Sequence, residues 1–502
     1  MKKYLLVSLI SLFAFSSLSC SSLSASPGEK QYLEAQQLEQ SADYLKALAA
    51  YKKAKAELAR EGKTGLADQC RYASLKMEKI KLTYTLTEAD LVKQIKKVYP
   101  EVPAKLLDQV IKDGRLDHIL IGGKTYYFAD SLNTLYHLYP YFLSKPQPGA
   151  LGKSEHFTQV IGKYVYGKDK ALAGVTRVNP INYLAEGKVV IPRKKLPAKG
   201  LFKVWVPLPL ITSAQSPIRV LSIYPERYIR YPLKQDGDIG LVYMEIPLAE
   251  IKEDLKIGVK ISFTHFEERF KIDPGQVGEY DKESALYKRY TAPGANIAIT
   301  PAIRQTALKL KGAETNPYKI AKLFYDHIVW DLNYSYTPHA ALSAFKVPES
   351  VFVQEKGYGD CGAQSMYFAA LCRAVGIPAR CPGGYQLFPI NEAGCGSHFW
   401  AQVYLPNYGW VPVDTSAGQI FKYLPSLTKK QQREYADYYF GKLDPFRYLI
   451  QTDVDLPLVP EPDEPLAFAA VLQQPTALCR EMDENPGFFI MENWKFKVKP
   501  VK

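Results

Sequence analysis

The chain has 502 residues, of which 47% are hydrophobic and 23% charged, a globular composition with room for about two to four domains. Its formal net charge is +13, from 64 basic and 51 acidic residues. This diffuse charge favours contact with an anionic membrane or an acidic polymer. No nucleic-acid-binding motif accompanies it, so a nucleic-acid partner is not predicted.

The first 20 residues predict an export signal that ends in a lipidated cysteine. Two lysines precede an apolar run over residues 4–15, which is too short for a membrane span and has the proportions of a signal peptide. The sequence Ser-Leu-Ser-Cys then resembles a bacterial lipobox, although Ser17 stands where leucine is usual. This predicts lipidation at Cys20 and anchoring in the cell envelope. The alternative is ordinary cleavage a few residues later, with Cys20 unmodified.

Residues 27–145 are predicted to be all helical. Alanines, leucines and tyrosines at helical spacing over 35–54 resemble part of a tetratricopeptide repeat, but there are too few repeats for an array, so a helical hairpin is expected. Helices continue to about residue 143, interrupted by a turn at Gly122-Gly123. Residues 146–186 contain scattered prolines and glycines with little periodicity, which predicts a linker or long loop.

Residues 187–270 are predicted to form a β-sandwich-like domain. Several short runs alternate between apolar and polar side chains and are separated by prolines and turn residues. The last ~40 residues include the strand formers Phe-Phe-Ile-Met at 488–491 and are expected to add a strand or a small β element.

The chemically informative region begins with Cys361. Residues 357–378 predict a loop, then a helix that starts near Cys361, then a stop at Gly376 and Pro378. A cysteine at a helix N-terminus lies beside unpaired N–H groups and the positive end of the helix dipole. This predicts a lowered thiol pKa, and a backbone N–H free to donate to a developing oxyanion.

His398 and Asp414, further along the chain, complete a candidate nucleophilic triad with Cys361. Residues 397–405 alternate as a strand, residues 406–409 form a turn, and a second strand returns to Asp414. A hairpin of this kind can place His398 and Asp414 within hydrogen-bonding distance if the register allows. In such a triad His398 takes the thiol proton and returns it to the leaving amine, while Asp414 orients the imidazole.

Four segments together resemble the core of the transglutaminase-like superfamily: Gly-Asp-Cys-Gly, Leu-Cys-Arg-Ala-Val-Gly-Ile-Pro-Ala-Arg, Ser-His-Phe-Trp-Ala-Gln-Val-Tyr and Gly-Trp-Val-Pro-Val-Asp. The resemblance implies an α+β fold with a papain-like core over 290–425. It assigns the nucleophile to Cys361, the base to His398 and the acid to Asp414. Family members often add an aromatic or amide oxyanion donor, for which Tyr336 is the candidate.

The sequence after Asp414 also looks like that of bacterial members of this superfamily. Residues 426–502 are therefore expected to wrap the core and border its cleft. The expected architecture is a transglutaminase-like cysteine core preceded by an all-helical region and a β-sandwich-like domain.

The resemblance implies a thioester formed at Cys361 with a peptide or protein amide. Water would resolve it in a peptidase or amidase, which we favour, and an amine in a transglutaminase. The alternative is a non-catalytic surface lipoprotein that binds peptide, glycan or a partner protein. No cofactor is expected, and no metal, because the soft ligand types lack the close CxxC spacing of zinc sites (Cys372, Cys381, Cys395 and His398). Cys381 and Cys395 can either bridge a loop or stay free.

Overall fold

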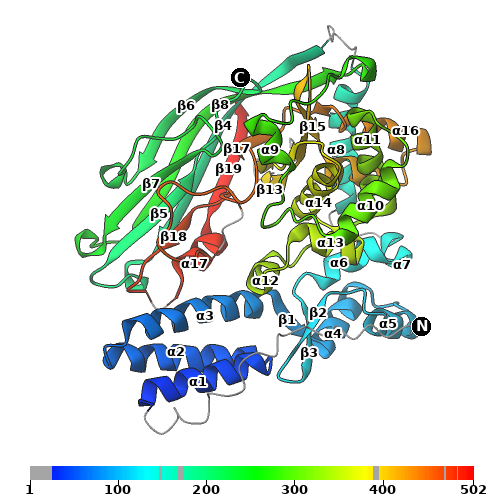
Figure 1. Ribbon diagram of the computed structural model, residues 1–502. Coiled ribbons are helices and arrows are strands. Elements are labelled where there is room, and N and C mark those ends of the chain that lie inside the picture. Colours follow the sequence, from blue (N-terminus) through cyan, green and yellow to red (C-terminus); the bar gives the residue numbers. More distant parts are fainter. Residues whose placement is uncertain are drawn as a thin grey trace. The chain divides into compact units, whose positions relative to one another are not determined.

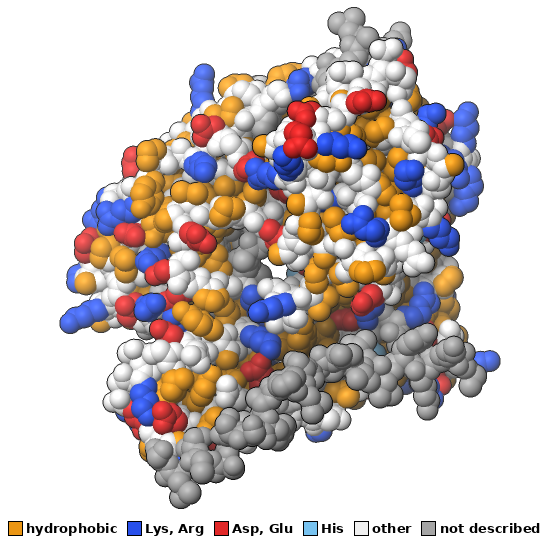
Figure 2. Space-filling view, viewed as in Figure 1, with side chains coloured by type: hydrophobic (Ala, Val, Ile, Leu, Met, Phe, Trp, Pro, Cys, Tyr) orange, Lys and Arg blue, Asp and Glu red, His pale blue; other side chains and the backbone are white. Residues whose placement is uncertain are grey.

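A computed structural model describes residues 25–145, 150–167, 174–387, 395–467, 471–482 and 484–501 (Figure 1). Cys20, the predicted lipidation site, and the rest of the predicted leader lie outside these residues. The chain divides into two units, Met1–Asp90 with His118–Tyr127, and Leu91–Asp117 with Phe128–Lys502. None of the described helices is long and apolar enough to cross a membrane. On the surface shown in Figure 2, basic and acidic side chains are interspersed.

The first unit contains three helices and a small sheet. The helices are α1 (Pro27–Gln40), α2 (Tyr44–Arg60) and α3 (Thr64–Thr83), and α2 packs against both of the others. Ser26 starts α1 with a capping box that includes Glu29. Small buried side chains, Ala35, Ala47 and Ala54, allow the helices to approach closely.

The all-helical interpretation of 27–145 is wrong at three short strands. These are β1 (Tyr84–Thr87), β2 (His118–Ile121) and β3 (Lys124–Phe128), in the order β1-β3-β2. Gly122 and Gly123 have φ of 54° and 78°, and they close the two-residue turn between β2 and β3. Positive φ at both turn residues suits a hairpin, so the glycines join strands and do not merely interrupt helices.

The linker interpretation of 146–186 is also wrong where the structure describes that segment. Helix α8 (Ala150–Val165) occupies its first half, and β4 (Gly174–Ile191) begins in its second half. The pairing of β4 shifts register between Val178 and Ile181, and Asn179 has φ of 50°. This bulge breaks the two-residue alternation by which a strand is recognised in sequence. The other helices before α8 are α4 (Glu88–Val98), α5 (Ala104–Lys112), α6 (Ser131–Leu138) and α7 (Pro140–Leu143).

A two-sheet sandwich follows α8. The larger sheet has the order β16-β8-β4-β19, with β6 also paired to β8, and the smaller has the order β18-β5-β7. Apolar side chains from both sheets form one buried cluster, which includes Ile257 and Val259 of β8 and Val204 and Met244 of the smaller sheet. The strands are β5 (Leu201–Pro207), β6 (Gln215–Tyr224), β7 (Leu241–Pro247), β8 (Leu255–Lys271), β16 (Lys442–Leu443), β18 (Thr476–Leu478) and β19 (Lys495–Val501).

The C-terminal part of the chain completes this sandwich. Strand β18 pairs with β5, and β19 pairs with β4. Leu458, Leu466 and Leu472 pack on Trp205, against the outer side of the smaller sheet. The strand expected within the last ~40 residues is present as β18 and β19, but the residues that suggested it, 488–491, lie in helix α17 (Pro486–Asn493). Asn485 caps that helix and Pro486 occupies its first turn, a strong helix start.

Helix α14 (Cys361–Ala374) is the buried centre of the remaining part, and residues 362–374 are all buried. Helices α10, α11 and α13 pack around it (Figure 1), and so do α15 and β14. Thr300 and Asn316 cap α10 and α11, with a proline after each cap. The helices are α9 (Ala285–Thr291), α10 (Pro301–Lys311), α11 (Pro317–Asp326), α12 (His339–Phe345), α13 (Glu349–Lys356), α15 (Thr415–Ile420) and α16 (Lys429–Tyr438).

Two three-stranded sheets flank α14, with the orders β13-β12-β17 and β11-β14-β15. The single strand predicted over 397–405 is therefore two strands in different sheets. The break falls at Trp400, whose N–H donates to the carbonyl of Pro382. The strands are β9 (Asn333–Tyr334), β10 (Tyr358–Gly359), β11 (Ala379–Arg380), β12 (Gly383–Leu387), β13 (Cys395–Phe399), β14 (Ala401–Leu405), β15 (Gly409–Val413) and β17 (Arg447–Gln451).

Candidate active site

Cys361 is the first residue of α14, where the sequence placed it. Asp360 caps the helix, and its Oδ1 accepts hydrogen bonds from the N–H groups of Gly362 and Ala363, both at 3.1 Å. Within the described structure the N–H of Cys361 has no acceptor, as is usual in the first turn of a helix. This N–H is therefore available to a negatively charged oxygen on a substrate.

The environment of the thiol differs from the expectation of a lowered pKa, which is wrong. Burial raises the pKa of Cys361, and the carboxylates of Asp360 and Asp414 raise it further, against the backbone amides of Phe399 and Gly362. The helix dipole alone would lower the pKa of the thiol, but the capping residue opposes that effect. Asp360 occupies two of the free N–H groups and brings a negative charge next to the sulfur. A thiolate at Cys361 consequently requires a neighbouring cation.

His398 and Asp414 are brought together as predicted. His398 Nε2 lies 2.8 Å from Asp414 Oδ2, and both side chains are buried. Because Nε2 faces the carboxylate, Nδ1 is the ring nitrogen left for the thiol. The Trp400 ring stacks near the imidazole, with centroids 6.2 Å apart, which restrains its orientation.

The route by which these two residues meet is not the predicted simple hairpin. His398 lies on β13, which pairs with β12, whereas Asp414 follows β15, which pairs with β14. Asp414 also caps α15 by accepting from the N–H of Ala417 at 2.9 Å. The break at Trp400 turns His398 out of the β14–β15 hairpin while keeping it next to Asp414.

Arg447, which the sequence argument did not single out as a site residue, completes the support of Asp414. Its Nη1 donates to Asp414 Oδ2 at 2.7 Å and its Nη2 donates to Asp444 Oδ2 at 2.7 Å. Burial alone would raise the pKa of Asp414, but His398, Arg447 and the Ala417 amide outweigh burial and hold it well below its ordinary value. Asp414 therefore stays ionised and can stabilise an imidazolium.

No hydrogen bond joins the Cys361 thiol to the His398 imidazole in the described structure, although the residue after His398 lies next to the sulfur. The backbone amide of Phe399, the residue after His398, lies near enough to the Cys361 sulfur to lower the pKa of the thiol. Gly362 makes this approach possible, because a Cβ there would meet the Phe399 ring at 3.3 Å. Contacts between catalytic groups are often long before substrate binds.

Tyr336, the candidate oxyanion donor, is 42% exposed. Tyr334 lies closer to the chemistry, since β9 pairs with β10, which leads directly into Asp360. Burial and then Cys361 raise the pKa of Tyr334 well above its ordinary value. For Tyr336, burial, Asp130 and Asp360 all raise the pKa more than Cys361 does. Tyr334 is thus the better candidate, and its place opposite Gly359 could not be read from sequence spacing.

His339 forms a second polar group beside the nucleophile. Its Nδ1 lies 2.7 Å from Glu349 Oε1 and its Nε2 lies 2.6 Å from Asp360 Oδ2. The His339 side chain is 45% exposed, and the partial loss of solvent around it lowers its pKa, but the two carboxylates outweigh this effect and raise the pKa well above its usual range. An imidazolium therefore offsets the negative charge of Asp360. The sequence carried no partner pattern for His339, because Glu349 and Asp360 lie on separate elements.

The other cysteines among the described residues remain thiols. Cys70, Cys372, Cys381, Cys395 and Cys479 are all free, so the bridge considered between Cys381 and Cys395 is not formed. Among the described residues there is no group of three or more His, Cys, Asp or Glu side chains able to hold a metal ion.

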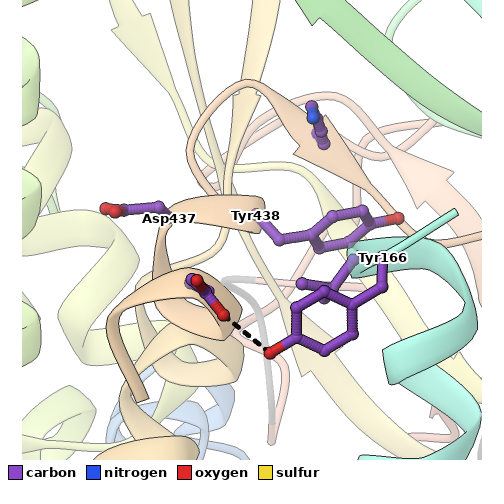
Figure 3. Close-up of a pocket in the computed structure, with 6 residues that line it drawn as sticks. Tyr166, Asp437 and Tyr438 are labelled. Carbon is purple, nitrogen blue, oxygen red and sulfur yellow. Dashed lines mark hydrogen bonds between the residues drawn. The ribbon is translucent and has the colours of Figure 1, made fainter. Parts of the chain in front are cut away.

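A pocket of about 400 Å³ lies elsewhere in the second unit, between the end of α8, helix α16 and β16 (Figure 3). Tyr166 donates to Glu434 across it at 2.8 Å. None of Cys361, His398 and Asp414 lines this pocket, whose walls are Val165, Tyr166, Glu434, Asp437, Tyr438 and Lys442.

Residues 304–415 match the family model of the transglutaminase-like superfamily, and this part of the chain is a transglutaminase-like core. Over 305 residues the chain is 26% identical to an uncharacterized protein of Haemophilus influenzae. The matched region covers 55% of this chain and 79% of that protein.

Similar solved structures include a candidate cysteine protease from Cytophaga hutchinsonii, at 14% identity and a TM-score of 0.38, covering 65% of this chain and 100% of that chain. The periplasmic domain of TgpA from Pseudomonas aeruginosa is 13% identical with a TM-score of 0.26, covering 54% of this chain and 100% of that chain.

Proposed function

We propose that the chain is a thiol-dependent acyl-transfer enzyme that acts on amide bonds of peptides or proteins. Cys361 is the nucleophile, His398 the general base and Asp414 the group that orients His398. The observation that carries this proposal is the 2.8 Å contact between His398 Nε2 and Asp414 Oδ2, because it leaves Nδ1 as the base.

The reaction follows from these roles. The Cys361 sulfur attacks the amide carbon as its proton moves to His398 Nδ1, forming a C–S bond and a negatively charged carbonyl oxygen. The N–H of Cys361 donates to that oxygen, and the Tyr334 hydroxyl is the proposed second donor in place of Tyr336. The C–N bond then breaks, the amine takes the proton from His398, and a thioester remains.

The same base can activate the second substrate. Water attacking the thioester releases a carboxylic acid and restores the thiol, whereas an amine gives a new amide. We favour hydrolysis because water is always present at high concentration. The enzyme is then a cysteine peptidase or amidase, with transglutaminase activity as the other outcome.

A second candidate function is non-catalytic binding of peptide, glycan or a partner protein. Two observations favour it: the pKa of Cys361 is raised, and no hydrogen bond joins its sulfur to His398 within the described structure. In that case the buried ion pairs around Asp414 stabilise the fold and have no catalytic role.

The location proposed from sequence is the bacterial cell envelope, with the chain tethered to a membrane by lipid at Cys20. The support is the lysine-apolar-Cys order of the leader.

The function is tested by trapping the acyl group. The full chain is incubated with a mixture of unrelated peptides, with and without hydroxylamine, and products are identified by mass spectrometry. We expect carboxylic acids without hydroxylamine and hydroxamates with it, both lost in Cys361→Ala and retained in Cys479→Ala. Products that persist in Cys361→Ala, or none in any variant over a broad peptide set, would favour the binding protein.

A further inference from the structure

The larger sheet of the sandwich has one apolar and one basic face. Along β4, Val189 and Ile191 are buried in the sandwich core, whereas Lys188 and Val190 are exposed. Along β8, Ile257, Val259 and Ile261 are buried, whereas Lys256 and Lys260 are exposed. Successive side chains of a strand point to opposite faces, so these lysines lie on the outward face of the sheet.

The strand register extends this outward face across four strands. Lys188 is opposite Lys495, Glu186 is opposite both Lys497 and Lys260, and Leu184 is opposite both Lys499 and Ser262. Arg219 of β6 is opposite Ser262 from the other side. Directly opposed residues of antiparallel strands project from the same face. We call the set the cationic face: Lys188, Arg219, Lys256, Lys260, Lys495, Lys497 and Lys499.

The cationic face is poorly neutralised. All seven of its basic residues are exposed, and Glu186 is the one acidic residue at the described positions paired with them. Glu186 lies 3.3 Å from Lys188, which leaves the other six basic residues without a carboxylate in this register. Seven positive charges against one negative give a net +6 on one sheet face, out of +13 for the whole chain.

The chemistry of this face matches an anionic lipid surface better than nucleic acid. Six of its seven basic residues are lysines, which act as point charges and lack the bidentate fork of arginine. Val190 and Leu221 are 43% and 51% exposed on β4 and β6, so apolar side chains accompany the charges. Lysines extend their heads toward phosphates while their stems contact less polar surroundings.

We propose that the cationic face binds membranes rich in anionic phospholipid. Such a contact attracts each basic side chain to the negative surface within about a Debye length. The contact is separate from the acyl-transfer site and does not depend on that activity. It is also separate from the lipid tether proposed at Cys20, since it uses the folded surface.

The test uses the full chain carrying Cys20→Ala, so that an attached lipid does not contribute. Flotation is measured with vesicles of phosphatidylcholine alone and with one quarter phosphatidylglycerol. The test variant is Lys256→Glu/Lys260→Glu/Lys497→Glu. The control, Lys112→Glu/Lys288→Glu/Lys430→Glu, changes net charge equally at exposed lysines that each pair with an acid.

We expect binding to the anionic vesicles only, weakened by salt, and weakened about a hundredfold in the test variant but less than about threefold in the control. An equal loss of vesicle binding in both variants would mean that binding depends only on net charge, and this would overturn the proposal. So would unchanged binding in the test variant, or loss of binding to a soluble RNA homopolymer without loss of vesicle binding. The alkylation rate of Cys361, unchanged in both, shows that the fold persists and keeps this test independent of the enzyme's activity.

Discussion

Arg447 donates to the same carboxylate oxygen of Asp414 that holds His398: Nη1 lies 2.7 Å from Oδ2. The guanidinium is fully buried and its other arm reaches Asp444. A buried carboxylate hydrogen-bonded to a guanidinium keeps its charge without solvent. The orientation of His398 therefore depends on a residue 33 positions beyond Asp414 in the chain.

Replacing Arg447 by Met should lower the free energy of unfolding by about 3–5 kcal/mol, because two buried carboxylates lose their cation. Urea unfolding monitored by circular dichroism measures this. The control is Arg289→Met, which breaks a half-exposed pair with Asp238 and should change stability by less than about 1 kcal/mol. Equal effects in the two variants would mean that Arg447 is not holding the carboxylates.

Gly384 lies directly opposite His398 in the β12–β13 pair, and a Cβ there would lie 1.8 Å from the carbonyl oxygen of Tyr448. Gly384→Ala should force β12 and β17 apart, cost about 3 kcal/mol of stability and displace His398. Gly65→Ala, with nothing within 4 Å of its added Cβ, should be neutral or stabilising. Thermal denaturation compares the two, and a Gly384→Ala variant as stable as wild type contradicts the predicted clash.

Glu268 gives a pH dependence of stability. Burial raises its pKa to about 7, although Arg177 and Arg380 oppose the shift. The folded state thus favours the protonated carboxyl: its stabilisation is complete below about pH 4.5 and is lost as the pH rises through about 7. Glu268→Gln should be about 2–3 kcal/mol more stable than wild type at pH 8 and similar to it at pH 4.5. An advantage of Glu268→Gln that does not grow between these pH values would show that Glu268 does not titrate in this way.

His339 is predicted to act on Cys361 through Asp360. In His339→Gln the carboxylate beside the sulfur loses its imidazolium partner, so the thiolate is less favourable and alkylation of Cys361 should slow by about threefold to tenfold. The alkylation midpoint should move to higher pH, a shift that a purely structural role would not produce. His156→Gln, an exposed control, should leave both unchanged.

The same variant gives a second readout. Since the pKa of His339 is raised on folding, its stabilisation is present below its unfolded value near 6.5 and is lost as pH rises through the higher folded value. The difference in melting temperature between wild type and His339→Gln should therefore be largest at acid pH and shrink under alkaline conditions. A difference that grows with pH contradicts the assignment.

The sequence identified the parts of the site that depend on local signals. The helix beginning at Cys361 has glycines before it and a Gly-Pro stop after it, and the two strand patterns brought His398 and Asp414 into consideration. The thiol pKa was predicted in the wrong direction because Asp360 is both a helix cap and a negative charge. The sequence motif indicates that Asp360 caps the helix, but only the structure shows that its charge lies beside the Cys361 sulfur.

Long-range pairing explains most of what sequence could not give. Strand β19 pairs with β4 although about 300 residues separate them, and its alternating lysines are typical of an exposed edge. Because the bulge interrupts the alternation of side chains, the start of β4 is not recognisable from sequence. The residues on either side of Trp400 alternate as in one continuous strand, so the break there is not recognisable either. Arg447 and His339 have no spacing relationship to the triad, because each is positioned by a different sheet or helix.

The most direct test of the Cys361-His398-Asp414 triad is the rate of alkylation of Cys361 against pH, mapped by peptide mass spectrometry in wild type and His398→Ala. Since burial and two carboxylates disfavour an isolated thiolate, we expect fast labelling at about pH 6–7 only when His398 can take the proton. In His398→Ala labelling should collapse at that pH, with a midpoint above the ordinary thiol value of about 8.5. Slow labelling in wild type with a midpoint near about 8.5, unchanged by the substitution, would contradict the triad and favour the binding protein.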